Sequence, residues 1–77
     1  MDKEILLFGV LTDIAGSDTI VVKNINNLDE LKSALLEKFP AFANYSFRFA
    51  VNNSFTENNI GICETDEIAV LPPFSGG

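Results

Sequence analysis

One amphipathic helix, expected at residues 28–39, is the feature that most constrains how this chain can fold. Asn27 can cap the helix, and Glu30 follows at the spacing of a capping box, while Pro40 ends the helical pattern. The apolar positions recur at spacings of three and four: Leu28, Leu31, Leu35 and Phe39. Such a spacing places them in one stripe, which requires a second layer of structure to cover it.

The remaining apolar segments have the length and composition of β-strands. One is a continuous apolar run, one is rich in β-branched residues, and one alternates between apolar and polar positions. Turn formers separate them: residues 12–18, with room for one short helical turn, the pair Asn52-Asn53, and Thr65-Asp66. The expected strands are residues 4–10, 19–23, 45–51, 54–56 and 67–71.

The order strand, strand, helix, strand, short strand, strand predicts the fold. One helix laid across a small mixed sheet is the simplest way to bury the apolar stripe and the sheet face opposite it, and this order is that of the β-grasp, or ubiquitin-like, fold of the α+β class. With 77 residues there is room for one domain, expected at residues 1–71. Residues 72–77 are expected to form an extended, flexible C-terminal tail.

Composition excludes several classes of function. The net charge of −6 argues against a nucleic-acid partner, and a single cysteine with no histidine excludes an internal disulfide and a zinc or iron–sulfur site. The apolar run at 5–11 follows acidic residues and has no cleavage site, so it is not expected to be a signal peptide, and it is too short to span a membrane. We therefore expect a cytoplasmic location.

The final segment, Leu71-Pro72-Pro73-Phe74-Ser75-Gly76-Gly77, is the clearest indication of function. The proline pair favours an extended approach, and two glycines leave a terminal carboxylate that can enter a narrow tunnel in another protein. Such a carboxylate can be adenylated and then thiolated or conjugated. Glycine-rich ends also occur by chance as frayed termini, but the proline pair directly after a strand makes that explanation less favoured.

An apolar docking face is expected beside this tail. Strand residues alternate between the two faces of a sheet, so two sets of side chains must point in opposite directions. If Ile5, Leu7, Ile68 and Val70 face the helix, the outward residues are Leu6, Phe8, Ala69 and Leu71. Phe55 of the short strand can join them. Phe8, Phe55 and Leu71 are therefore predicted to contact a partner, although scattered exposed apolar residues are also normal in a small domain.

Two other candidate sites are given structural interpretations. Cys63 could relay sulfur, but a lone cysteine in an apolar stretch is more often a small buried hydrophobic residue. Glu64, Asp66 and Glu67 could suggest a metal site, but three acids at a turn are more often a solvated surface. No metal-binding residue is predicted.

These features together resemble the MoaD family, the small sulfur-carrier subunits of molybdopterin synthase, and less closely the ThiS sulfur carriers of thiazole biosynthesis. The matching pieces span nearly the whole chain: Leu7-Phe8-Gly9, Asp13-Ile14-Ala15-Gly16, the helix around Leu28 to Leu36, Ala50-Val51-Asn52, Asp66-Glu67-Ile68-Ala69 and the tail. The tail is the most specific of them, because its proline pair is more typical of MoaD than of ThiS.

The resemblance implies a mechanism that the residue pattern alone does not supply. A partner similar to ubiquitin-activating enzyme would use ATP and magnesium to adenylate the Gly77 carboxylate, and a sulfur donor protein would convert it to a thiocarboxylate. The tail would then enter the large molybdopterin synthase subunit and pass sulfur to cyclic pyranopterin monophosphate. The chain would bind no cofactor itself, and the catalytic residues would belong to its partners.

Two alternatives use the same glycine. A sulfur carrier for thiazole or another metabolite would be loaded in the same way and would deliver its sulfur elsewhere. A ubiquitin-like modifier would form an isopeptide bond between Gly77 and lysines of target proteins. The sequence leaves both open, since each begins with adenylation of the terminal carboxylate.

Overall fold

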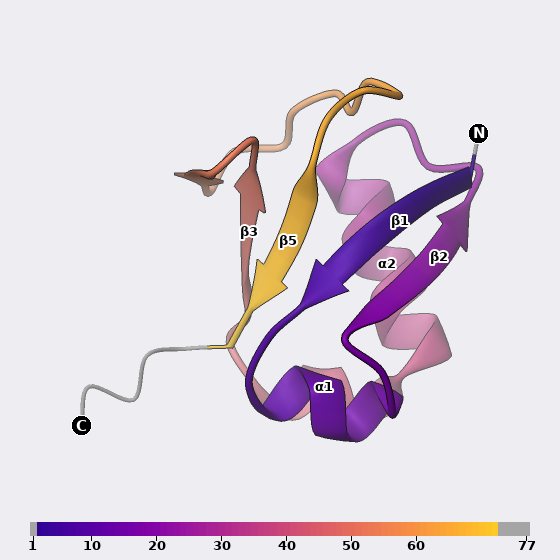
Figure 1. Cartoon of the computed structure of the whole chain (residues 1–77), viewed down its shortest axis with the longest axis vertical. Coiled ribbons are helices and arrows are strands. Elements are labelled where there is room, and N and C mark those ends of the chain that lie inside the picture. The colour runs from indigo at the N-terminus through magenta and orange to yellow at the C-terminus, as the bar shows by residue number, and fades with distance from the viewer. Residues whose placement is uncertain (1, 73–77) are drawn as a thin grey trace.

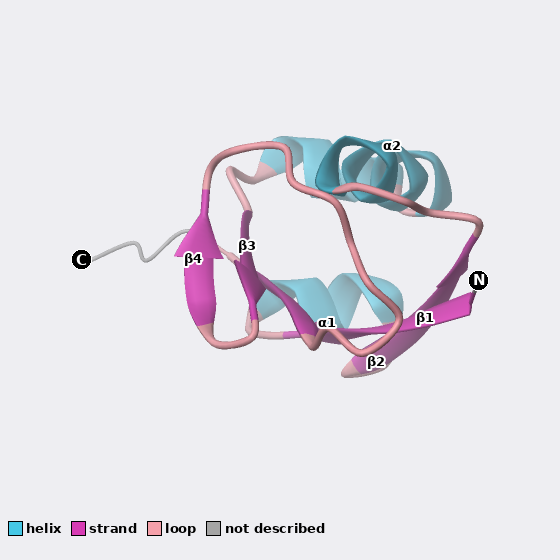
Figure 2. Ribbon diagram, turned by 90° about the horizontal axis from the view of Figure 1, so that it is seen from above, coloured by secondary structure: helices cyan, strands magenta, loops and turns pink. Residues whose placement is uncertain are grey.

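The predicted β-grasp fold is confirmed by a computed structural model of the chain, which describes residues 2–72 (Figure 1). A five-stranded sheet has the order β2-β1-β5-β3-β4, in which β1 and β5 are parallel and the other neighbours are antiparallel. Helix α2 lies across one face of this sheet (Figure 2). The elements are β1 (Asp2–Leu7), α1 (Val10–Ala15), β2 (Thr19–Lys23), α2 (Leu28–Lys38), the 3₁₀ helix η1 (Pro40–Asn44), β3 (Arg48–Val51), β4 (Ser54–Thr56) and β5 (Ile68–Leu71).

The core lies between the sheet and α2. Alternation along the two central strands directs one set of side chains inward, as predicted: Ile5, Leu7, Ile68 and Val70 are fully buried. They meet the apolar stripe of α2, in which Leu28, Leu31 and Leu35 are buried. Burying these aliphatic side chains provides most of the stabilisation of so small a domain. None of the helices within residues 2–72 combines the length and the apolar character that a membrane span requires.

Helix α2 begins with the predicted cap. The Glu30 backbone N–H donates to Asn27 Oδ1 at 2.9 Å. The Glu30 side chain reaches back one residue further than in a standard capping box, because its Oε1 accepts from the Asn26 backbone N–H at 2.7 Å. The acidic side chains of Asp29 and Glu30 also complement the positive end of the helix dipole. The start of α2 is therefore fixed by local sequence.

The turn between β3 and β4 also follows the sequence. Asn52 and Asn53 both have positive φ, at 52° and 69°, and they join a hairpin in which Val51 pairs with Ser54. A two-residue loop with left-handed backbone at both positions matches the twist of the strands, and asparagine tolerates that conformation. The predicted short returning strand is confirmed as β4.

The first strand differs from its prediction. It covers Asp2–Leu7 instead of residues 4–10, and Val10 begins helix α1. Gly9 ends the strand because it has φ 59° and ψ −138°, a conformation open almost only to glycine. The apolar residues beyond it belong to the helix, where Leu11 is buried and Ile14 packs against the core.

The third strand is shorter than predicted, since residues 45–47 precede it and η1 occupies Pro40–Asn44. Phe42, at the centre of η1, is fully buried and stacks on Phe39 with 5.1 Å between ring centroids. Its edge meets Phe47 at 5.8 Å, and Phe47 meets Phe49 of β3 at 5.7 Å. The strand-like alternation at 45–47 thus arises from residues that lead out of this aromatic cluster, and Tyr45 is exposed.

Candidate functional site

The root of the tail lies at the end of β5, between β1 and β3. Pro72 follows this strand directly and packs onto the turn after β1. A Cβ placed on Gly9 would lie 2.7 Å from Pro72 Cγ, so only a residue without a side chain allows this approach. The turn at Gly9 therefore supports the point at which the tail leaves the domain. Residues 73–77, which include Pro73, Phe74, Ser75, Gly76 and Gly77, lie outside the described residues.

Most of the apolar side chains predicted beside the tail share the sheet face that points away from α2, and Phe8 lies just beyond the end of β1. Leu6 pairs with Ala69, Ala69 with Ala50, and Ala50 with Phe55, so these residues form one row across four strands. Phe8 and Phe55 are 46% and 47% exposed, whereas Leu71 is half-buried. We call Leu6, Phe8, Phe55, Ala69 and Leu71 the outer apolar patch. Its position next to Pro72 agrees with the expectation from strand alternation.

Arg48 is the residue of this face that the sequence did not single out. It pairs with Leu71 across the sheet, and its guanidinium carbon lies 4.7 Å from the centroid of the Phe55 ring. Its Nη2 is 3.9 Å from Glu57 Oε1, a distance at which an exposed ion pair is weak. Stacking on the ring holds the cation against the patch. Only the pairing of β3 with both β4 and β5 reveals this arrangement.

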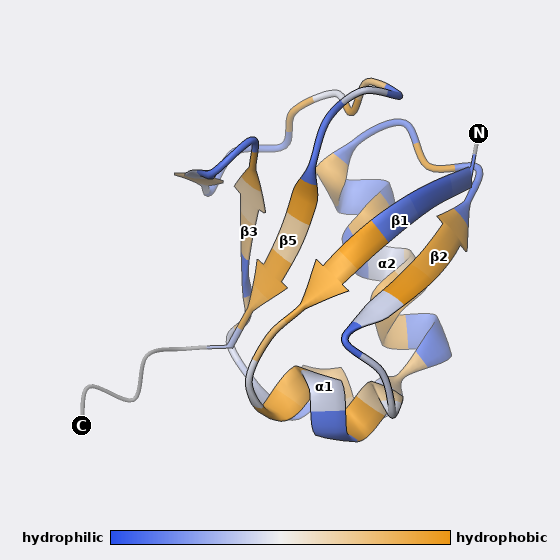
Figure 3. Ribbon diagram, viewed as in Figure 1, coloured by the Kyte–Doolittle hydropathy of each residue, from blue (hydrophilic) through white to orange (hydrophobic). Residues whose placement is uncertain are grey.

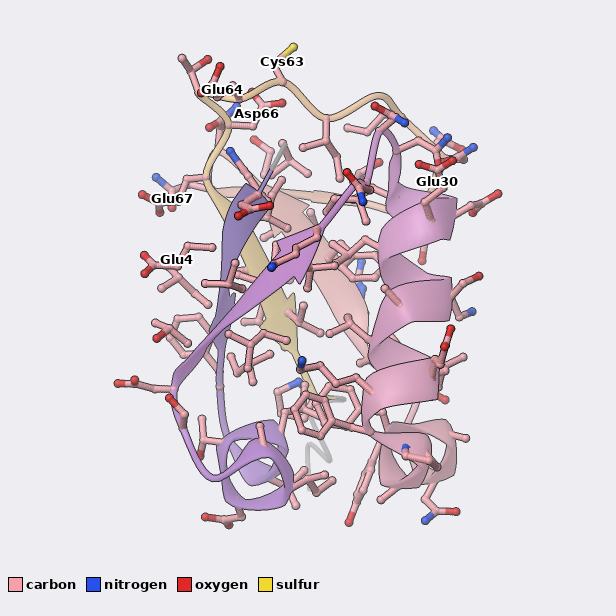
Figure 4. The ribbon with its side chains drawn as sticks, turned by 90° about the vertical axis from the view of Figure 1, so that its right-hand side faces the viewer. Glu4, Glu30, Cys63, Glu64, Asp66 and Glu67 are labelled. Atoms are coloured by element: carbon pink, nitrogen blue, oxygen red, sulfur yellow. The ribbon has the colours of Figure 1, made fainter. Side chains whose placement is uncertain are left out.

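The outer face changes from acidic to apolar along the strands. Figure 3 shows β1 hydrophilic where it begins and hydrophobic towards its end. On the same face Glu4 precedes Leu6 in β1, and Glu67, just before β5, precedes Ala69 of that strand. Glu4 and Glu67 project from one side of the sheet, away from α2 (Figure 4). The apolar half of the face lies at the tail end, and the acidic half lies at the opposite end.

A hydrogen-bonded network holds the loop that leads into β5. Lys3 is the only buried charged residue of the described chain, and its Nζ donates to the backbone carbonyls of Cys63 at 3.1 Å and Glu64 at 2.8 Å. Asp66 accepts from the Cys63 N–H at 2.8 Å and from Asn52 Nδ2 at 3.0 Å. These contacts join β1, the β3–β4 turn and the loop, so the start of β5 is anchored from two sides.

This network corrects one interpretation of the sequence and adds to another. Cys63 is exposed, not buried, because the loop turns its backbone towards Lys3 and its side chain outward (Figure 4). Asp66 is not simply part of a solvated surface, because it accepts two hydrogen bonds within the protein. Within residues 2–72, His, Cys, Asp and Glu side chains do not gather in threes or more around a point that could hold a metal ion.

The network makes stability depend on pH. The Cys63 backbone N–H, followed by the Asn52 amide, lowers the pKa of Asp66 below its ordinary value of 3.8. A carboxyl whose pKa is lower in the folded state stabilises that state above 3.8, and this contribution is lost as the pH falls through the lowered value. We expect Asp66→Asn to reduce the fall in melting temperature between neutral pH and about pH 3.

Circular dichroism melts at a series of pH values test this prediction. Glu64→Gln is the matched control, because the Glu64 side chain is exposed and its contact with Lys3 uses the backbone carbonyl. The control should keep the pH dependence of the wild-type chain. Equal pH dependence in Asp66→Asn and wild type would show that the Asp66 contacts contribute nothing to acid sensitivity.

Comparisons with known proteins agree with this fold and extend to the tail. A model of the ThiS family matches residues 5–77. Small archaeal modifier protein 1 of Haloferax volcanii is 25% identical to this chain, the alignment covers 100% of both chains, and the TM-score is 0.79. The protein of that name from Methanosarcina acetivorans is 24% identical, with 99% of this chain and 96% of that chain covered and a TM-score of 0.74.

A third structure has the same fold at lower identity. It is a protein of Pyrococcus furiosus assigned as molybdopterin converting factor, subunit 1, which is 15% identical, with 95% of this chain and 98% of that chain covered and a TM-score of 0.83. At this identity the likeness shows a shared ubiquitin-like fold. The family model, in contrast, extends from the first strand through Gly77. The chain therefore belongs to the ThiS family of MoaD/ThiS ubiquitin-like proteins.

Proposed function

We propose that this chain is the sulfur-carrier small subunit of molybdopterin synthase and works in the cytoplasm. The observation that carries the proposal is the outer apolar patch at the root of a Pro-Pro-Phe-Ser-Gly-Gly tail, on a domain of the ThiS family. A partner that binds this patch receives the tail at a fixed place. Docking would make delivery of the terminal group effectively intramolecular, which is a large rate advantage.

The chemistry resides at Gly77. An adenylating partner would transfer AMP from magnesium-bound ATP to the carboxylate and release pyrophosphate. Sulfide supplied by a sulfur donor protein would then attack the acyl carbon, so that a carbon–sulfur bond forms, AMP leaves and Gly77 ends in a thiocarboxylate. On the large synthase subunit the tail would insert through Pro72, Pro73, Phe74, Ser75 and Gly76, and sulfur would pass to cyclic pyranopterin monophosphate. The chain would supply the reacting terminus and the docking face, while the catalytic groups and any bound nucleotide would belong to the partners.

The acidic half of the outer face supports a defined orientation of the partner. Glu4 and Glu67 precede the paired residues Ile5 and Ile68 on neighbouring parallel strands, so two like charges lie side by side. Like charges on neighbouring strands are destabilising unless a cation compensates them. A partner with an apolar contact region and an adjacent basic region would fit this face in one direction. That direction would point the tail towards the apolar side of the partner's binding surface.

A second function has specific support. The similarity to small archaeal modifier protein 1 over the full length of both chains favours a protein modifier that is conjugated through Gly77. A thiazole-type sulfur carrier is a further alternative within the ThiS family. Denaturing gels of cell extracts separate the modifier from the two carriers, because covalent adducts of many sizes persist after denaturation. The identity of the partner separates the two carriers from each other.

A pull-down from the source organism through an N-terminal tag tests the docking prediction. We expect wild-type chain to recover the large synthase subunit, and Phe55→Ser together with Phe8→Ser to lose roughly 10-fold or more of the complex, because exposed aromatic residues often dominate binding energy. Val21→Ser is the matched control, because Val21 is exposed to a similar extent but lies on β2, outside the patch. Recovery of thiazole synthase instead would assign the chain to the other carrier branch. Full binding by the double variant would exclude the patch as the docking face.

A further inference from the structure

The contact between Gly9 and Pro72 joins the end of β1 to the first residue after β5. These two strands are parallel neighbours, and their register pairs Leu7 with Val70. Two residues further along, the same register places Gly9 opposite Pro72. Pro72 has no N–H with which to extend either ladder of β5, and the positive φ of Gly9 turns the chain away into α1. A packing contact therefore takes over where the backbone pairing stops.

The ring of Pro72 packs directly against the Gly9 backbone. A Gly9 Cβ would lie 2.7 Å from Pro72 Cγ and 3.4 Å from Pro72 Cδ, so the ring fills the space that a side chain would need. Gly16, at the other end of α1, provides a contrast. It also has positive φ, but a Cβ added there would meet nothing within 4 Å. Position 9 thus requires glycine for two reasons, its backbone conformation and the space for the ring, and only the second concerns the tail.

The Gly9 turn is a firm support because it is held on both sides. Before it, the Leu7 N–H donates to the Asp18 carbonyl at 2.8 Å. After it, Leu11 is fully buried in the core. The Gly9 carbonyl accepts two hydrogen bonds from Thr12, one from the backbone N–H at 3.1 Å and one from Oγ1 at 2.8 Å. The proline ring therefore meets a surface that has little freedom to move.

We propose that Gly9 and Thr12 are positioning residues for the reaction at Gly77. The Gly9 turn, tied by the Thr12 hydroxyl, holds Pro72 in place and so fixes the direction in which the tail leaves the domain. The inference rests on the proposed function, because it assigns a step in the delivery of the terminal carboxylate. Docking through the outer apolar patch would fix the position of Leu71, and the Gly9 turn would set the direction beyond it.

Direction at the root matters because Gly77 is five residues beyond Pro72. An extended segment of that length reaches about 15 Å, so a change of about 10° at its root moves its end by about 3 Å. A partner that receives a tail of variable direction has to restrict it on binding. Restricting the backbone of one residue corresponds to a factor of roughly 5–30. We therefore expect loss of the Gly9–Pro72 contact to slow activation of the carboxylate about 10-fold.

Gly9→Ala and Gly16→Ala form a matched pair for the test. Both substitutions strain a turn of positive φ at an end of α1, but only the first places a methyl group against Pro72. The reaction is followed in a single turnover of the full chain with ATP and saturating adenylating partner. The carboxylate oxygen attacks the α-phosphate, and the released pyrophosphate is measured. We expect Gly9→Ala to react about 10-fold more slowly with little change in partner affinity, and Gly16→Ala to react close to the wild-type rate.

Pro72→Ala provides a second background, because it removes the ring carbons that the Gly9→Ala methyl group would meet. It should itself react more slowly than wild type. In this background Gly9→Ala should slow the reaction no further, since the contact through which it acts is already lost. Equal slowing by Gly9→Ala in both backgrounds would overturn the proposal, because the substitution would then act through the fold. A wild-type rate in Gly9→Ala would overturn it as well.

Thr12 gives a test that leaves the glycine in place. Thr12→Val removes the hydroxyl that binds the Gly9 carbonyl and should slow the reaction a few-fold. Thr12→Ser keeps the hydroxyl and should restore the wild-type rate. Equal rates in these two variants would overturn the role of Thr12.

The wild-type chain separates this inference from the proposed function. If no adenylating partner activates wild type, the proposed function fails and the inference fails with it. If wild type is activated and Gly9→Ala is activated equally well, only the inference fails. Thermal melts test the contact without any partner: Gly9→Ala should lower the melting temperature less in the Pro72→Ala background than in wild type, because the clash is then absent. Equal losses in both backgrounds would show that the ring does not press on Gly9, and would overturn the inference.

Discussion

Replacing Gly77 by valine is expected to abolish sulfur loading of the chain while its thermal unfolding stays unchanged. The branched side chain of valine widens the tail at the reacting residue. The proposed function requires this residue to pass through a narrow tunnel. Misplacement of a reacting group by about 1 Å can cost roughly 100-fold in rate, so loading should fall by at least that factor. The buried apolar residues of the described chain all lie between Ile5 and Val70, so we expect the core packing to be unchanged. Intact mass spectrometry after incubation with the adenylating partner, ATP and a sulfur donor measures the exchange of oxygen for sulfur.

Ser75→Ala is the control for this experiment, because it alters the tail and leaves both glycines in place. It should be loaded at a rate within a few-fold of wild type. Loading of Gly77→Val at the wild-type rate would show that the last residue need not be glycine, and would overturn the requirement for passage through a narrow tunnel. Loading that is lost in Gly77→Val, combined with covalent adducts of the wild-type chain on other proteins, would instead support the modifier.

The parts of the fold that local sequence determines were predictable. Asn27 and Glu30 specify the start of α2 through their own hydrogen bonds, and Asn52-Asn53 specify the hairpin turn through backbone conformations that few residues tolerate. The inward and outward faces of β1 and β5 follow from alternation, since the strand period is two. The position of Phe55 and Leu71 on one face followed from these same local rules, together with the order of the strands, whereas Phe8 is exposed just beyond the end of β1.

Other features depend on contacts between distant parts of the chain. Cys63 is exposed because Lys3, sixty residues away in sequence, donates a hydrogen bond to the Cys63 backbone carbonyl and orients the loop. Lys3 shares its strand face with Ile5, and that parity is the one sequence signal that could have indicated its inward position. Arg48 reaches the outer face beside Phe55 through strand pairing that no local pattern specifies. Propensity and periodicity carry no information on such contacts.

The 3₁₀ helix η1 is another feature that local sequence does not predict. It begins at Pro40, just after the end of α2, where a loop is the usual expectation. The alternation from Tyr45 onward favours a longer strand than the one observed. Tertiary packing decides otherwise, because η1 contacts both α1 and α2 and places Phe42 against Phe47, which in turn contacts Phe49 of β3. The aromatic ring is held by its neighbours and not by local propensity.

We therefore expect Phe42→Ala to have the largest effect on stability of any single substitution outside the sheet. Truncating a buried phenylalanine costs about 3–5 kcal/mol, through lost burial and the cavity that remains. Stacking on Phe39 and the edge contact with Phe47 add to this loss. A domain of this size has a free energy of unfolding of roughly 4–12 kcal/mol, so the variant should lose a third or more of it. Urea unfolding followed by circular dichroism measures the change in the midpoint at constant slope.

Phe8→Ala is the matched control, because it removes the same ring from a half-exposed position. It should change the free energy of unfolding by about 0.5 kcal/mol or less, as surface substitutions usually do. If Phe42→Ala cost less than about 1 kcal/mol, η1 would have to collapse into the vacated space, and the aromatic cluster would not support the fold. Sulfur loading distinguishes this effect from that of Gly77→Val. Whatever fraction of Phe42→Ala remains folded should still be loaded, because the change removes packing and leaves the tail intact.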